Sequence, residues 1–412
     1  MSISRRDLLG LGAGSGAAVL LAGCSTDAGP GAGPATSGPS SAGSPSSTAS
    51  GAESPTPSPT PSTKPSAAIP RLTVQEAASG LEIPWGLGFS GSTAVLTERA
   101  GRIQVLRDGR PSRVTADLDD VAAAGEGGLT GLVVDPKDPR RIVVAFNSRE
   151  GDVRIVPFTL SADLSRATRG KPLLTGLPAN PSGRHSGCRL RFGSDGLLWV
   201  GTGDTARGSL PQDRTSLGGK VLRLDGRTGA PAPDNPWPDA QQTTQRYVYS
   251  YGHRNVQGLA LQPGTGRMFS VEHGSAVDDE VNLLAKGANY GWNPVGSGDY
   301  DESVPMTDTT LPGAVRAVWS SGDPTLATSG AAFVTGEAWG GYAGCLAVAC
   351  LKAQKLLMLR LTPAGALQQV LEVPELDGSH GRLRTVETDP SGALWVTTAN
   401  GEDDTLLRIT PA

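Results

Sequence analysis

His185 and Asp204 are the two side chains of this sequence best suited to proton transfer. His185 lies in residues 183–190, and Asp204 directly follows the apolar run 198–203. If these segments form a hairpin, both ends return to one place and the carboxylate comes near the imidazole. A carboxylate that accepts from one ring nitrogen orients the ring and strengthens the other nitrogen as a general base. We therefore predict a catalytic dyad, with a purely structural histidine as the alternative.

A second group of polar residues surrounds Arg254 and Asn255 in the sequence Tyr-Gly-His-Arg-Asn-Val-Gln-Gly-Leu at 251–259. This segment places a guanidinium and amide donors beside an apolar strand, although a surface arginine next to a turn asparagine has the same pattern. Other polar residues hold comparable places before or after apolar strands: Glu98, Glu126, Glu272, Thr325, Lys352, Arg382 and Arg384.

Six stretches share one pattern, a short apolar strand, a turn at Gly, Asp or Pro, and a second strand. Their openings are residues 85–89, 130–136, 189–196, 257–264, 329–336 and 383–392. Their spacing of roughly 45 to 70 residues suits four-stranded blades, and amphipathic helical stretches are missing between them. We predict an all-β fold, a six-bladed β-propeller. Because the innermost strands of a propeller line its axis, polar groups at equivalent places should converge on one mouth of the channel.

The N-terminal region carries export signals rather than fold. Residues 1–23 are interpreted as a twin-arginine lipoprotein signal peptide, because Arg5 and Arg6 precede an apolar run that ends in a lipobox-like Leu-Ala-Gly-Cys. Cys24 would then be lipidated, while an ordinary cleaved signal with an incidental cysteine is the alternative. Residues 24–68 are rich in Pro, Ser, Thr and Gly and are predicted to form a disordered tether. We expect an exported bacterial protein, held at the cell membrane by lipid alone and facing outside the cytoplasm, with the propeller in residues 69–412.

Charge and cysteine content exclude some classes of function. The formal net charge is -4 and no basic run is present, so nucleic acid is not an expected partner. Cys345 and Cys350 should lie on opposite faces of one strand, too far apart to form a disulfide. Cys188 lacks the ligand spacing of a zinc site. We expect Cys345 and Cys350 to be small buried side chains, and the sequence leaves open whether Cys188 pairs with either of them.

Four motifs carry a resemblance to a known family: Gly-Lys-Val-Leu-Arg-Leu at 219–224, Gly-His-Arg-Asn-x-Gln-Gly-Leu at 252–259, Asp-Asp-Glu-Val-Asn at 278–282 and Asn-Tyr-Gly-Trp at 289–292. The chain resembles the soluble quinoprotein glucose/sorbosone dehydrogenases from about Leu81 to its C-terminus. Members of this family are six-bladed propellers that bind pyrroloquinoline quinone (PQQ) and calcium. The resemblance implies oxidation of an aldose at its anomeric hydroxyl to a lactone, with an electron acceptor that the sequence does not identify.

The resemblance also implies roles for individual residues. His185 matches the general base, Asp204 its carboxylate partner, and Arg254 the cation beside the quinone carbonyl. Further residues match contacts to the cofactor: Glu126, Asn255, Thr325, Lys352, Arg382, Arg384 and Thr398. A lysine and two arginines suit a ligand with three carboxylates. Gly274 and Ser275 match positions whose carbonyls help to hold the calcium of the cofactor, and Glu280 and Tyr290 match a second calcium site.

Three positions depart from the family pattern. Glu126 and His273 stand where relatives have glutamine, and Asp323 replaces an aromatic residue beside the quinone in some relatives. These changes bear on substrate identity and cofactor affinity. Because one propeller shape serves many functions, a non-catalytic propeller that binds a carbohydrate or a protein is the alternative from another class.

Overall fold

The computed structural model describes residues 68–295 and 300–412. The predicted signal peptide, Cys24 and the tether up to residue 67 lie outside this range. The first strand, β1, begins at Leu72, and the predicted start of the folded part near residue 69 stays a prediction. Within the described residues, no helix combines the length and the apolar character needed to cross a membrane.

Four antiparallel sheets of four strands each make up most of the fold. The first contains β1 (Leu72–Leu81), β25 (Asp404–Pro411), β24 (Leu394–Thr398) and β23 (Leu383–Thr388). The second contains β11 (Gly187–Phe192), β12 (Leu197–Thr202), β13 (Lys220–Asp225) and β14 (Val248–Tyr251). The third contains β15 (Val256–Leu261), β16 (Met268–Glu272), β17 (Glu280–Leu283) and β18 (Trp319–Ser320). The fourth contains β19 (Thr328–Phe333), β20 (Leu346–Cys350), β21 (Lys355–Leu361) and β22 (Leu367–Glu372).

The remaining strands form one sheet of nine. Its first half is a meander of β2 (Pro84–Ser90), β3 (Thr93–Glu98), β4 (Arg102–Arg107) and β5 (Arg110–Ala116). Its second half is a meander of β6 (Leu129–Asp135), β7 (Asp138–Asn147), β8 (Val153–Leu160) and β9 (Arg166–Arg169), with β10 (Leu174–Leu177) paired to β8. A short parallel pairing of β5 with β9 joins the halves. Three 3-10 helices lie in connections: η1 (Thr243–Tyr247), η2 (Glu337–Tyr342) and η3 (Pro374–Leu376).

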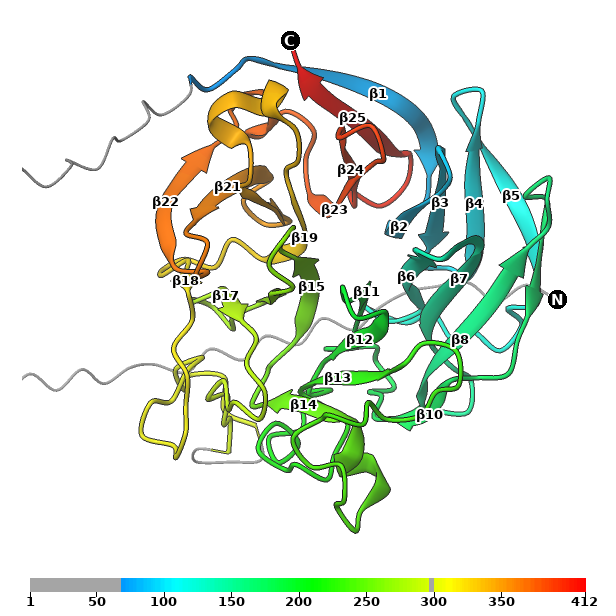
Figure 1. Ribbon diagram of the computed structural model, residues 1–412. Helices are drawn as coiled ribbons and strands as arrows, with labels where there is room; N and C mark the ends of the chain where they lie inside the picture. Colours follow the sequence, from blue (N-terminus) through cyan, green and yellow to red (C-terminus); the bar gives the residue numbers. More distant parts are fainter. Residues whose placement is uncertain (1–67, 296–299) are drawn as a thin grey trace, which may run out of the picture. The chain divides into compact units, whose positions relative to one another are not determined.

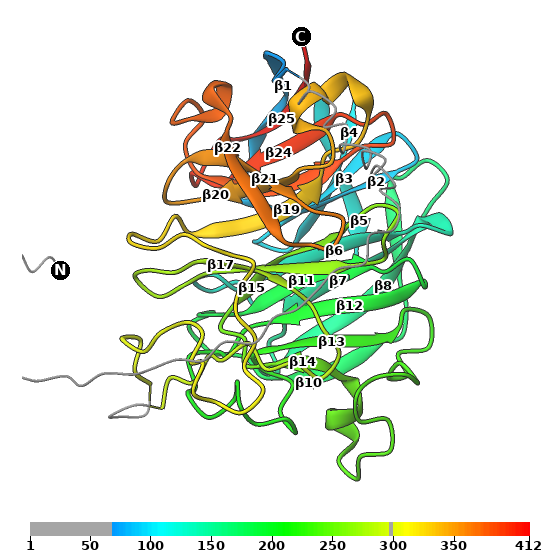
Figure 2. The same cartoon turned by 60° about the vertical axis from the view of Figure 1, so that its left-hand side comes forward.

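The sheets are arranged like the blades of a propeller around a central axis (Figures 1 and 2). Strands β2, β6, β11, β15, β19 and β23 lie innermost, and each packs against the next around the ring. These strands contain the repeat openings expected from the sequence, so the prediction of strands there is confirmed. The ring is closed by the N-terminal strand, because β1 pairs with the C-terminal strand β25 from Leu72 opposite Pro411 to Leu81 opposite Asp404.

The core is divided among the spaces between neighbouring sheets. The sequence of strand β20 is apolar throughout because it packs against two sheets. Leu346, Val348 and Cys350 pack toward the sheet of β15. Ala347, and Cys345 just before the strand, pack toward the sheet of β23. Both faces of β20 are therefore buried. The expectation that the two cysteines face opposite sides is confirmed, and Cys188, Cys345 and Cys350 are all buried free thiols.

Candidate active site

The hairpin of β11 and β12 brings His185 and Asp204 together. Gly187, at the start of β11, pairs with Thr202, at the end of β12. His185 lies two residues before Gly187 and Asp204 two residues after Thr202, so both leave the sheet at the same edge. His185 Nδ1 lies 2.8 Å from Asp204 Oδ1, and both side chains are buried. With Nδ1 donating to the carboxylate, Nε2 is the ring nitrogen left to accept a proton. The predicted contact is present, and the catalytic role stays a prediction.

Gly203 makes this close contact possible. A Cβ atom at Gly203 would lie 1.9 Å from the carbonyl oxygen of His185 and 3.0 Å from Asn255 Oδ1. Real side chains do not approach backbone so closely, and glycine is the residue that permits it. The Gly-Asp sequence at the end of β12 thus lets the chain pass against the loop that carries His185, which places the Asp204 carboxylate at the imidazole.

Asp204 is held by three donors besides His185. Oδ1 accepts from the backbone N–H of Ala206 at 2.8 Å, and Oδ2 accepts from Trp292 Nε1 at 2.7 Å and from the Tyr300 hydroxyl at 2.8 Å. The Tyr300 oxygen also lies 3.2 Å from His185 Nδ1. These donors fix the orientation of the buried Asp204 carboxylate.

Arg254 enters the same site from the start of β15. Its backbone N–H donates to Glu272 Oε2 at 3.1 Å, and its Nη1 donates to the carbonyl oxygen of His273 at 3.3 Å. Its guanidinium lies 5.6 Å from the ring centre of Trp292, the same residue that donates to Asp204. Arg254 Nη2 forms an ion pair with Glu302 Oε1 at 2.5 Å. The predicted cation and the predicted dyad therefore share one wall of the site.

Glu126 and Asn255 connect the second half of the nine-stranded sheet to this group. Glu126 Oε2 accepts from the backbone N–H of His185 at 3.2 Å and lies 3.4 Å from Asn255 Nδ2. Asn255 Oδ1 accepts from the backbone N–H of Gly187 at 3.0 Å. Both residues thus fix the segment around His185, from the segments just before β6 and β15.

Arg384 is a buried residue at the start of the innermost strand β23. Its Nη1 donates to Gln257 Oε1 at 3.0 Å, and no described carboxylate lies within ion-pair distance of it. Burial lowers the pKa of Arg384 to about 10, since little around it offsets the loss of hydration. Arg382 and Lys352 are exposed, and their side-chain nitrogens form no hydrogen bond or ion pair with the described residues. The three predicted cations therefore have no carboxylate partners among residues 68–295 and 300–412.

Thr325, Thr398 and Asp323 lie outside the His185 group. Thr325 donates to Asp279 Oδ1 at 2.8 Å, and Thr398 donates to Asp404 Oδ1 at 2.7 Å. Asp323 is exposed. In the described residues these side chains support neighbouring loops, and their predicted contacts to a cofactor remain predictions.

Three buried nitrogens in and near the site lack hydrogen-bond partners among the described residues: Arg254 Nε, Arg384 Nε and His273 Nε2. Burial, followed by the positive charges of Arg254 and Arg384, lowers the pKa of His273 well below its ordinary value. A buried donor without a partner is costly, and a ligand rich in oxygen atoms would satisfy it. These residues fit a polyanionic planar ligand such as PQQ.

The predicted calcium ligands divide into two places. Gly274 donates its N–H to Asp279 Oδ1 at 2.9 Å, while Glu280 accepts from Thr307 and Asn282 and Tyr290 donates to the carbonyl oxygen of Leu283. Burial, followed by the charge of Glu272, raises the pKa of Glu280 to about 8. Asn282 donates through Nδ2 to both Glu272 and Glu280. Its Oδ1 is buried and has no hydrogen-bond partner among the described residues. One unpaired oxygen beside two carboxyl groups fits a hard cation. No group of three or more His, Cys, Asp or Glu among the described residues forms a ready metal site.

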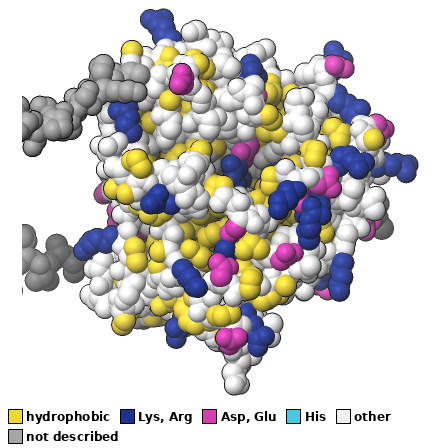
Figure 3. Space-filling view, in the orientation of Figure 1, with side chains coloured by type: hydrophobic (Ala, Val, Ile, Leu, Met, Phe, Trp, Pro, Cys, Tyr) yellow, Lys and Arg dark blue, Asp and Glu magenta, His cyan; other side chains and the backbone are white. Residues whose placement is uncertain are grey.

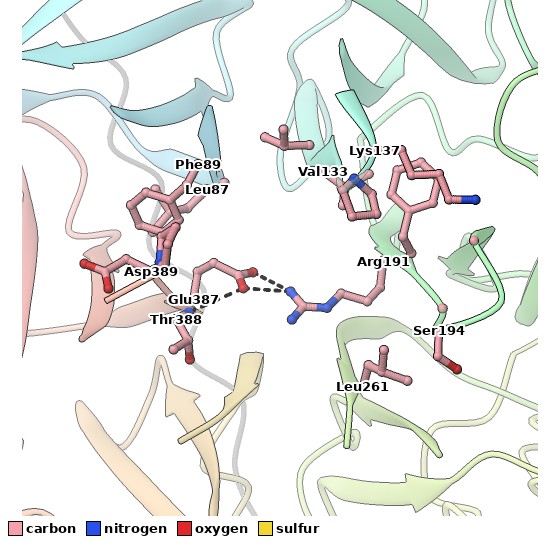
Figure 4. Close-up of a pocket in the computed structure, with 17 residues that line it drawn as sticks. Leu87, Phe89, Val133, Lys137, Arg191, Ser194, Leu261, Glu387, Thr388 and Asp389 are labelled. Atoms are coloured by element: carbon pink, nitrogen blue, oxygen red, sulfur yellow. Dashed lines mark hydrogen bonds and ion pairs between the residues drawn. The ribbon is translucent and has the colours of Figure 1, made fainter. Parts of the chain in front are cut away.

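A cavity of about 570 Å³ lies at the opposite ends of the inner strands (Figure 4). Phe89, Leu261 and Thr388 line it at the ends of β2, β15 and β23, and Arg191 pairs with Glu387 across it at 2.6 Å. None of the predicted catalytic or cofactor residues lines this cavity. The chemistry predicted from sequence is therefore at the other mouth of the channel. In the face seen in Figure 3, acidic and basic side chains stand among hydrophobic ones around the middle of the ring.

Sequence reasoning named Trp292 only as part of the motif at 289–292, without a role, and did not single out Tyr300 and Glu302. Tyr300 and Glu302 lie on the connection between β17 and β18, residues 284–318, which has no strand pattern of its own. A connection that long in a regular repeat is itself a functional signal, and it could have drawn attention to this segment.

Comparison with known proteins gives the family. The profile of the glucose/sorbosone dehydrogenase family matches residues 81–408. The chain belongs to this family. It is 28% identical to the aldose sugar dehydrogenase YliI of Escherichia coli over 84% of this chain and 94% of that protein.

Solved structures of family members agree with the fold. The PQQ-bound aldose sugar dehydrogenase of Streptomyces coelicolor is 30% identical, with a TM-score of 0.68 over 83% of this chain and 100% of that one. The apo-form of the soluble aldose sugar dehydrogenase of E. coli is 27% identical, with a TM-score of 0.74 over 83% of this chain and 100% of that one. The family match spans His185, Asp204, Arg254 and Arg384, so the site described above lies within the glucose/sorbosone dehydrogenase part of the chain.

Proposed function

We propose that this protein is a PQQ-dependent dehydrogenase that oxidises an aldose at its anomeric hydroxyl to the lactone. One observation carries the proposal: a buried imidazole paired with a carboxylate faces the same site as guanidinium nitrogens that lack partners. Family membership supports it, and two relatives are named aldose sugar dehydrogenases, one of them in a PQQ-bound form. The two meanders of the nine-stranded sheet count as two blades in this proposal, which makes a six-bladed propeller with the site at one mouth.

His185 acts as the general base in this scheme. Asp204 fixes the ring through Nδ1, so Nε2 accepts the proton of the anomeric hydroxyl. PQQ, when bound, supplies a quinone that accepts the hydride from the anomeric carbon. Arg254 would stabilise negative charge on the quinone oxygen next to it, since its Nε is buried and has no partner among the described residues. Trp292 and Tyr300 hold Asp204 in place during proton transfer.

The cofactor would be held chiefly by cations. Arg384 and Arg382, with Lys352 at the rim, would pair with its carboxylates, and Asn255 and Glu126 would border it on the side of His185. Calcium would be bound by the carbonyls of Gly274 and Ser275 next to the cofactor, and by Glu280 with Tyr290 at a second place. Chelation of calcium is expected to weaken PQQ binding.

The protein is further proposed to act outside the cytoplasm on a lipid anchor at Cys24. The twin-arginine and lipobox sequences support this location. Replacement of Cys24 by Ala should release the protein from host membranes, and the wild-type N-terminus should carry the mass of a lipid. Membrane retention of the Cys24→Ala protein, without a lipid mass on the wild type, would refute the anchor.

Reconstitution tests the enzymatic proposal. The purified apo-protein is supplied with calcium and PQQ and assayed on a panel of sugars with an artificial acceptor dye. The proposal predicts dye reduction by one or more aldoses that requires PQQ. PQQ binding without reduction by any sugar, or no PQQ binding at all, would favour a non-catalytic propeller instead.

A further inference from the structure

Glu302 connects two arginines at the site. Its Oε2 lies 2.5 Å from Arg184 Nη2, and its Oε1 lies 2.5 Å from Arg254 Nη2. Arg184 directly precedes the predicted base, and two residues before Glu302 the Tyr300 hydroxyl contacts Asp204. Glu302 therefore stands beside the place where a substrate must meet His185.

The charge of Glu302 is maintained by its partners. Burial opposes ionisation, but the hydrogen bonds from Arg184 and Arg254 outweigh it and lower the pKa of Glu302. The carboxylate also leaves Arg254 Nε free, since it occupies only Nη2. Glu302 can thus neutralise Arg254 at Nη2 and leave Nε available to a ligand.

The carboxylates of the site have different partners. Asp204 and Glu126 contact His185, and Glu302 lies next to this group, where it pairs with Arg184 and Arg254. Arg384 and Arg382 form a second group, and neither pairs with a carboxylate among the described residues. A tricarboxylate is attracted to the second group. An anionic sugar would have to enter among the carboxylates of the first, where like charges repel.

We propose that Glu302 makes the site selective for neutral aldoses over sugars that carry a carboxylate or a phosphate. This inference rests on the proposed sugar oxidation and adds the substrate class. Without the charge of Glu302, Arg184 and Arg254 are free to bind an anionic group, because guanidinium is the preferred partner of carboxylate and phosphate. The residue then determines specificity and takes no part in proton transfer.

The test compares Glu302→Gln with wild type, both loaded with PQQ, on glucose and on glucuronate. Glu302→Gln should lower the ratio of kcat/KM for glucose to that for glucuronate by about tenfold or more, mainly through a lower KM for glucuronate. Glu302→Asp, which keeps the charge, should retain the wild-type preference. Glu372→Gln is the matched control, because Glu372 is an exposed acid on β22 that pairs with Lys355 at 3.1 Å. A ratio in Glu302→Gln within about twofold of wild type would overturn the inference.

A binding measurement gives a second readout that needs no turnover. Titration of the apo-proteins with PQQ should show binding to Glu302→Gln about threefold or more tighter than to wild type, because a negative charge next to Arg254 is removed. Glu372→Gln should bind as wild type does. Weaker PQQ binding by Glu302→Gln would mean that Glu302 only positions Arg254, and would contradict the inference. Failure of wild type to oxidise any neutral aldose would instead refute the proposed function, so the two failures are distinct.

Discussion

The hydroxyl of Tyr300 donates a hydrogen bond of 2.8 Å to Asp204 Oδ2, between residues 96 positions apart in the sequence. The bond ties the long connection after β17 to the hairpin that carries the predicted base. It makes Tyr300 a positioning residue, because its hydroxyl acts on His185 through the carboxylate.

Replacement of Tyr300 by Phe removes this bond and keeps the ring. Since a hydrogen bond to a charged group contributes about 1.5–3 kcal/mol, we expect the rate of PQQ reduction by glucose to fall about tenfold, with a smaller change in KM. The measurement is a stopped-flow reductive half-reaction across pH. Tyr249→Phe is the control, because the hydroxyl of Tyr249 makes no hydrogen bond among the described residues. A wild-type rate and pH profile in Tyr300→Phe would show that the hydroxyl does not position the dyad.

Replacement of Arg384 by Met should have opposite effects on the apo-protein and on cofactor binding. Removal of a buried charge without a carboxylate partner should stabilise the apo-protein by about 1–2 kcal/mol. The same change should weaken PQQ binding at least about tenfold, because a carboxylate of the ligand loses its partner. Thermal melts of the apo-protein and PQQ titration measure the two effects.

Arg140→Met serves as the control for this pair of effects, since Arg140 is an exposed residue of β7. It should leave both the melting temperature and the PQQ affinity close to wild type. If Arg384→Met bound PQQ as wild type does, Arg384 would not be a cofactor ligand.

Lys220 forms hydrogen bonds with the loop that follows Asp204. It is buried at the start of β13, and its Nζ donates to the carbonyl oxygens of Leu210, Pro211 and Gly218 at 2.6, 3.0 and 2.6 Å. Burial lowers the pKa of Lys220 to about 7. Between about pH 7 and pH 10 the unfolded chain therefore binds this proton and the folded chain does not, so Lys220 makes folding more favourable as pH rises.

The pH dependence of stability tests this. The free energy of unfolding of wild type, relative to Lys220→Met, should increase from pH 7 to about pH 10 in urea denaturation. Lys286→Met, a change at an exposed lysine, should show no such trend. A constant difference between wild type and Lys220→Met would mean that three carbonyls keep the ammonium charged across this range.

Local regularity explains what the sequence could predict. His185 and Asp204 are 19 residues apart on one hairpin, so strand pairing alone brings them together, and the inner strands follow from the repeated apolar openings. Tyr300 and Glu302 contact the site from an irregular connection, and no periodic pattern predicts where such a segment returns. Thr398 lies at the end of a strand, as polar residues near the site do, but its hydroxyl donates to Asp404. The direction of a side chain depends on its local partners, which the sequence pattern does not give.

The measurement that tests the central claim most directly is reduction of bound PQQ by glucose in a single turnover, for wild type and His185→Ala. Both proteins are loaded with cofactor to saturation, and absorbance follows the reduction. If His185 is the general base, the variant should bind PQQ as wild type does but react about 100-fold or more slowly. Equal rates in the two loaded proteins would contradict the mechanism, even with the fold and the cofactor correctly assigned.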